Sequence, residues 1–123
     1  RGIEAKDNRL PTKAPVYAFR FGDVPYAVPY SAFEGGAVFK LEDSTAFLHR
    51  ARGAAIFESS VAFVTRGSLE DKDGVWQTVD GATFDAAAGE FVGAGADKMR
   101  RLEGFDTFWY SWSLTHPSTA VLE

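Results

Sequence analysis

Short β-prone runs separated by two-residue turn pairs are the feature that most constrains the fold of this chain. The runs VYAFRF and VPYAVPY flank Gly22-Asp23, and the runs VWQTV and ATFDA flank Asp80-Gly81. Glycine next to aspartate in a short loop is typical of tight β-hairpins, because glycine adopts positive φ at no steric cost. The sequence therefore predicts two antiparallel hairpins, one near each end of the chain.

The segments between these hairpins predict further strands. AVFKL and the alternating run TAFLHRAR, on either side of Glu42-Asp43-Ser44, predict another hairpin. AAIFE and SVAFVTR are short and rich in Val, Ile and Phe, so we interpret them as a buried strand pair, although AAIFESSVAFV also fits a helix. We expect SLEDKDG to be a charged turn, the Ala86–Ala88 run to be helical for one turn, and one more strand to lie around Lys98 to Leu102.

Together these runs predict a mainly β fold in which antiparallel hairpins form a curled sheet or small barrel, with one short C-terminal helix. Pro25 and Pro29 cannot donate ladder hydrogen bonds, which places their run at a sheet edge or makes it irregular. Residues 1–15 are polar and contain two prolines, so they are predicted to be an N-terminal arm whose order depends on docking. Residues 16–123 are predicted to be a single domain.

Composition excludes several classes of function. The chain has no cysteine, which rules out thiol nucleophiles, iron–sulfur clusters and Cys-based zinc sites. Its net charge of -4 and the lack of a basic run argue against a nucleic-acid partner. No apolar stretch approaches the length that spans a bilayer, so we expect no membrane insertion of the chain as given. Phosphate-loop, dinucleotide, calcium-loop and metalloprotease motifs do not occur, and we expect neither a cofactor nor a metal.

The segment from Gly104 to Leu122, GFDTFWYSWSLTHPSTAVL, carries most of the distinctive residues. Asp106 or Thr107 is predicted to cap a short helix, in which aromatic side chains three and four positions apart would contact one another. Pro117 disfavours helical geometry at His116 and is expected to end this helix. Consecutive aromatic positions face different directions, so some of them lie near the surface or beneath another segment.

The leading functional hypothesis is a non-catalytic binding or accessory domain with an aromatic-lined pocket for a small molecule. An aromatic face beside an amide can orient a small polar ligand, and exposed Trp and Tyr suit a binding surface. Core packing of the same aromatic residues, and a helix-end role for the histidine, are the alternative interpretations. The predicted ligand-facing set is Trp76, Gln77, Trp109, Tyr110, Trp112 and His116.

Two other classes of function stay open. A hydrolase or isomerase could use His116 with Asp106 or Glu58 as proton-transfer groups, because histidine titrates near neutral pH and a paired acid could complete the site. Asp85 and Glu90 are further acidic candidates, and His49 fits a solvated strand face. A self-associating module is the third class, in which the aromatic helix packs against its copy in a homo-oligomer.

GVWQTVDG and the C-terminal pattern TFWYSWSLTHPST together resemble a family catalogued as domain of unknown function 3179. The similarity spans most of residues 16–122, and the C-terminal motif is its distinctive part. The resemblance implies a shared scaffold and favours an exported or periplasmic location, which the residues themselves leave open. Members of that family often carry a Cys-Pro-x-x-Cys-like element after the opening hairpin. Gly35, Gly36 and Val38 occupy that region here, so any thiol or metal role of the element is lost.

Overall fold

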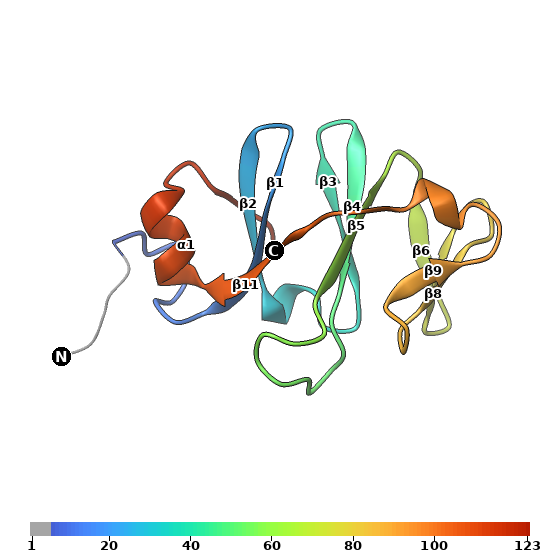
Figure 1. Cartoon of the computed structure of the whole chain (residues 1–123), viewed down its shortest axis with the longest axis horizontal. Helices are drawn as coiled ribbons and strands as arrows, with labels where there is room; N and C mark the ends of the chain where they lie inside the picture. Colours follow the sequence, from blue (N-terminus) through green and yellow to red (C-terminus); the bar gives the residue numbers. More distant parts are fainter. Residues whose placement is uncertain (1–5) are drawn as a thin grey trace.

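In a computed structural model, three four-stranded sheets follow one another along the long axis of the molecule, and a helix covers the outer face of the first sheet (Figure 1). The structure describes residues 6–123, so residues 1–5 of the predicted arm lie outside the described residues. Within that range the chain is mainly β, with twelve strands and one α-helix, and the sheets are not closed into a barrel. The predicted fold class is therefore confirmed, with separate sheets in place of a barrel.

The first sheet has the order β11-β1-β2-β12. Its strands are β1 (Pro15–Phe21), β2 (Val24–Pro29), β11 (Gly104–Phe108) and β12 (Ala120–Val121). The predicted hairpin is confirmed, and Gly22 and Asp23 both adopt positive φ, as a two-residue hairpin turn with the right twist requires. The short parallel strand β12 pairs with β2 only opposite Tyr26 and Ala27, so neither Pro25 nor Pro29 needs to donate to it.

The middle sheet has the order β10-β5-β4-β3, and the third sheet has the order β6-β7-β8-β9. The middle strands are β3 (Ala37–Leu41), β4 (Ser44–His49), β5 (Val61–Thr65) and β10 (Arg100–Arg101). The third-sheet strands are β6 (Leu69–Lys72), β7 (Val75–Thr78), β8 (Thr83–Asp85) and β9 (Glu90–Val92). The remaining elements are the 3-10 turns η1 (Tyr30–Ala32) and η2 (Ala96–Lys98) and the helix α1 (Trp109–Thr115). The predicted β3–β4 and β7–β8 hairpins are both present.

Three apolar layers hold these elements together. Alternate residues of β1 point to opposite faces, so Val16 packs beneath α1 whereas Phe19 packs toward the middle sheet. The same alternation in β4 directs Leu48 to the first sheet and Phe47 to the third. Strands β1 and β4 are thus buried on both faces, which explains why their sequences are nearly continuous apolar runs.

The loop between β4 and β5 corrects one prediction. AAIFE forms neither a strand nor a helix, because the side chain of Arg50 donates hydrogen bonds to the carbonyls of Ala54 and Ala55 and so takes groups that a ladder would use. Phe57 and Ser59 adopt positive φ, which is incompatible with an extended strand. Only the second of the two predicted runs forms a strand, β5.

Other boundaries also differ from the prediction. SLEDK is the strand β6 and not a turn, because it pairs with β7 as an outer strand whose charged side chains face solvent. Residues 86–89 form the turn between β8 and β9 and are not helical. The predicted strand near Lys98 to Leu102 shortens to β10.

The start of α1 is the largest local correction. Asp106 and Thr107 lie within β11 and cap nothing, and the structure shows no side-chain cap at the helix start. Carbonyl groups of the arm perform that role, because the backbone N–H groups of Trp109 and Tyr110 donate to Ala14 and Thr12 at 2.9 and 3.0 Å. The arm and the helix therefore complete each other.

Candidate functional site

The six predicted ligand-facing residues lie in two separate places. Trp76 and Gln77 belong to β7 of the third sheet, whereas the other four lie on or just after α1, which covers the far face of the first sheet. Figure 1 shows these regions at opposite ends of the long axis. The structure does not bring the six residues together into one aromatic-lined pocket.

The two helix tryptophans are buried, and their polar atoms are engaged. Trp109 is fully buried, and its indole Nε1 donates to the carbonyl of Asp7 at 2.7 Å. Trp112 Nε1 donates to Thr119 Oγ1 at 2.9 Å, and both of these residues are buried. The indoles thus attach the arm and the C-terminal segment to the helix, which is a structural role.

His116 ends the helix. Its ring stacks on Trp112 with the centroids 3.6 Å apart, and Nδ1 lies 3.2 Å from the carbonyl oxygen of Trp112. The Thr115 hydroxyl lies 2.9 Å from the same nitrogen. These contacts match the expected interaction of the imidazole with a last helical carbonyl. None of the described contacts joins His116 to a carboxylate.

Trp76 and Gln77 point to opposite faces of β7, as adjacent strand residues do. Trp76 packs against Phe47 and donates from Nε1 to the carbonyl of Gly35 at 2.9 Å, which ties the third sheet to the start of β3. Gln77 faces outward and borders a shallow hollow of about 280 Å³ on the third sheet. A single ligand in one cleft could not contact both side chains.

Asp106 has a buried partner of another kind. Its Oδ1 accepts a hydrogen bond from the Tyr30 hydroxyl at 2.5 Å, and that hydroxyl accepts the backbone N–H of Phe57 at 3.1 Å. Burial, and then the bond to Asp106, raise the pKa of Tyr30 to about 12, so its hydroxyl stays protonated near neutral pH. The side chain of Glu58, the other acidic candidate, is exposed on the loop next to Phe57.

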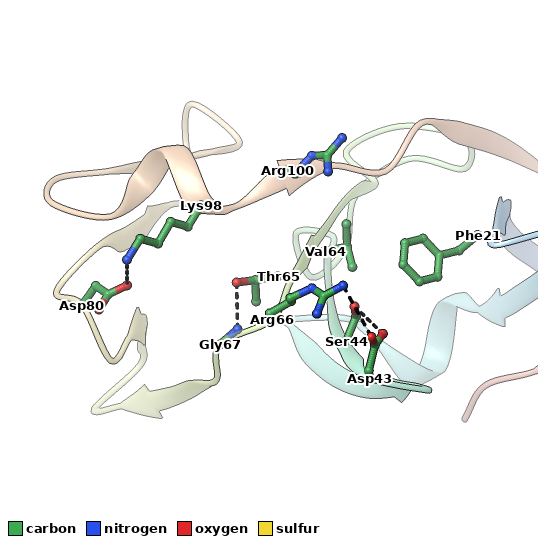
Figure 2. Close-up of a pocket in the computed structure, with 10 residues that line it drawn as sticks. All are labelled: Phe21, Asp43, Ser44, Val64, Thr65, Arg66, Gly67, Asp80, Lys98 and Arg100. Atoms are coloured by element: carbon green, nitrogen blue, oxygen red, sulfur yellow. Dashed lines mark hydrogen bonds and ion pairs between the residues drawn. The ribbon is translucent and has the colours of Figure 1, made fainter.

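A hollow of about 650 Å³ lies at the edge of the stacked sheets, where hairpin ends from all three sheets meet. Figure 2 shows side chains from separate segments around it, including Phe21 at the end of β1, Arg66 after β5, and Lys98 in η2. Phe21 and Val64 supply apolar surface, and both also pack against the core between the first and middle sheets. The hollow therefore has an apolar side that is continuous with the core.

Five charged side chains line the same hollow. Arg66 pairs with Asp43 at 3.5 Å, and Lys98 pairs with Asp80 at 3.2 Å. The side chains of both pairs are between 45% and 83% exposed, so each pair contributes little to stability and can rearrange around a ligand. Among the lining residues, Arg100 is the one cation that no carboxylate pairs in the described part of the chain.

The position of Arg100 follows from strand register. Arg100 pairs with Val64 across the β10–β5 ladder, so the two side chains point to the same face of the middle sheet. That face is the one toward the first sheet, where Phe21 lies. A positive charge therefore stands beside the apolar part of the hollow.

Sequence reasoning missed this hollow because its residues come from five places in the chain. The only local signal is Arg100-Arg101, two cations in an acidic chain, and its short length argued only against nucleic acid. No group of three or more His, Asp or Glu side chains within residues 6–123 is arranged to hold a metal ion. Of the helices in that range, none is long and apolar enough to cross a membrane.

Comparisons with family models, with curated proteins and with solved structures find no match for this chain. The resemblance to domain of unknown function 3179 therefore stays a prediction from its motifs. Any function has to be argued from the hollow and from the surfaces of the molecule.

Proposed function

We propose that this chain is a non-catalytic binding or accessory domain, and that the hollow at the sheet edge takes a small molecule carrying both an apolar part and an anionic group. The observation that supports it best is the position of Arg100 beside Phe21 and Val64, without a carboxylate partner among the described residues. A volume of about 650 Å³ lies within the range of small-molecule sites.

Charge selects the class of ligand. Three cations and two carboxylates line the hollow, which leaves one positive charge in excess although the whole chain is acidic. An anionic group would interact with Arg100 directly and could draw Arg66 or Lys98 from its exposed partner. A carboxylate or phosphate on an aromatic or aliphatic body meets both requirements.

The geometry favours binding over catalysis. Neither histidine lines the hollow, and the interactions of His116 are those of a helix end. Asp106 is engaged with Tyr30, so the proposed pairing of His116 with an acid has no contact to support it. The self-associating helix also lacks a supporting contact, since Trp109 and Trp112 are buried within the chain itself.

Titration of isotope-labelled protein with phenyl phosphate, followed by amide NMR, tests the proposal. We expect shifts at Val64, Gly67 and Arg100, and a weaker response to phenol, which keeps the ring without the charge. Replacing Arg100 by alanine should weaken phenyl phosphate binding about tenfold, as expected for the loss of one charge-assisted hydrogen bond.

Lys13→Ala is the matched control, because it removes an exposed cation outside the hollow and should leave the affinity unchanged. Equal affinities of the Arg100→Ala variant and the parent protein would refute the proposed anion site. So would shifts confined to residues outside the hollow.

A further inference from the structure

Strand β11 forms one edge of the first sheet. It pairs with β1 over five residues, and within residues 6–123 no strand pairs with its outer side. The other five-residue edge strand, β3, carries a lysine, Lys40, which is a common protection of sheet edges, whereas β11 has neither lysine nor proline. Phe105 of β11 is 66% exposed. This edge is thus open to an additional strand.

A rigid loop stands beside this edge. The buried guanidinium of Arg50 donates to the carbonyls of Ala54 and Ala55 at 3.1 and 3.0 Å and pairs with Glu34 at 2.9 Å. It also lies over the ring of Tyr30, at 4.0 Å from the centroid. Loop 51–60 is therefore held in place from within by one side chain.

The loop presents apolar side chains next to β11. Ile56 and Phe57 are 52% and 42% exposed, and Phe57 has a φ of 66°, which a bulky residue rarely adopts. The Tyr30 hydroxyl, itself bound to Asp106 of β11, accepts the Phe57 N–H and holds this conformation. The Phe57 ring packs against Phe108 at 5.1 Å, so the loop and the strand form one apolar ledge, defined here as Ile56, Phe57 and Phe108.

The charges around the ledge are acidic. Glu58 follows Phe57, Glu103 precedes β11, and Asp106 lies within the strand. Arg50 is buried in its pair with Glu34, and Arg52, the other cation of this region, reaches Gly35 and His49 instead. A second copy of this chain, paired edge to edge, would bring these carboxylates against their own copies, which is unfavourable.

We propose that β11 and the ledge form a docking surface for an extended segment of another protein, in which basic side chains alternate with apolar ones. The segment would add a strand to the outer edge of β11 through backbone hydrogen bonds. Its apolar side chains would contact the ledge, and its basic side chains would face Glu58, Glu103 and Asp106. This surface is separate from the hollow proposed above and does not depend on it.

The probe is a blocked seven-residue peptide in which four lysines alternate with valine, phenylalanine and valine. We expect amide shifts in residues 104–108 and 56–58 and slowed hydrogen exchange of outward amides in β11, with no shift at Arg100. Phe57→Ala should weaken binding about tenfold, the size typical of an interface anchor. Leu114→Ala, which truncates another exposed apolar side chain on α1, is the matched control and should bind as the parent protein does.

Three outcomes would overturn the proposal. The first is equal binding of a peptide with glutamate in place of lysine, and the second is equal binding of a peptide N-methylated along its pairing edge. The third is a dimer in sedimentation velocity that Phe57→Ala abolishes, which would assign the surface to a second copy. If Phe57→Ala fails to fold, Glu58→Gln replaces it, and a reduced affinity at low salt is then the expected result.

Discussion

At the helix end of the molecule, the buried tryptophans direct their indole N–H groups to partners on other segments, whereas at the opposite end the third sheet packs phenylalanines that carry no polar atom. Trp109 bonds to Asp7, far away in the sequence. Phe47, Phe84 and Phe91 instead contact one another edge to face or tilted, at 5.1 to 5.4 Å. The first arrangement fixes position by direction, and the second fills volume.

This difference teaches where tolerance to substitution should lie. An unmade hydrogen bond in a buried site leaves a desolvated donor, which is costly. Apolar clusters accept residues of similar volume at small cost. The helix end should therefore be sensitive to chemistry and the third-sheet end to size.

The strongest way to break the comparison is Trp109→Ala. It removes a fully buried side chain together with its bond to the arm, so we expect a loss of about 3–5 kcal/mol in the free energy of unfolding. Urea denaturation followed by circular dichroism measures the loss. Val79→Ala, at a residue that is 75% exposed, is the control and should change little. A loss below about 1 kcal/mol would show that the arm does not stabilise the helix.

A pair of milder substitutions sharpens the comparison. Trp112→Phe removes the buried bond to Thr119 and part of the ring volume, and should cost about 2–3 kcal/mol. Phe91→Leu keeps the third-sheet cluster apolar and should cost less than about 1.5 kcal/mol. Both costs are measured in the same urea titration. Equal costs would remove the distinction between the two ends.

Thr119→Val isolates the hydrogen bond from the packing, because the two side chains have nearly the same shape. The Trp112 indole loses its acceptor and the carbonyl of His116 loses a donor, so we expect a cost of about 1–2 kcal/mol. Exchange of the Trp112 indole proton, followed by NMR, should become faster. An unchanged exchange rate would mean that the bond does not persist in solution.

The smallest expected effect is the pH dependence caused by His49, at the third-sheet end. Burial, followed by the charge of Arg52, lowers the pKa of His49 below its usual 6.5. The unfolded chain therefore binds the proton more readily, so this contribution to stability is complete above pH 6.5 and is lost as pH falls through the folded pKa. Unfolding midpoints from pH 7.5 to 5 should fall less steeply for His49→Leu than for the parent protein.

The sequence predicted those parts of the fold that depend on local chemistry. Gly22 and Asp23 specify a hairpin turn by their own backbone preferences, and the hairpin is present. The helix start and loop 51–60 were wrong because distant groups decide them: arm carbonyls cap α1, and one arginine side chain, that of Arg50, organises the loop. Residue type alone reveals neither contact.

The candidate sites show the same limit. The aromatic residues were conspicuous in the sequence, and the structure places Trp109 and Trp112 in the core. Arg66, Lys98 and Arg100 are ordinary surface letters that the stacking of three sheets brings around one hollow. Composition shows the amount of each chemistry but not which residues become neighbours.

Strand β4 has a further consequence for how the protein tolerates genetic change. Since one face of this strand contacts the first sheet and the other contacts the third, consecutive positions such as Phe47 and Leu48 are both fully enclosed. In a saturation library selected for folded protein, both should therefore be depleted of polar variants. In β6, whose charged positions are exposed, most replacements should survive.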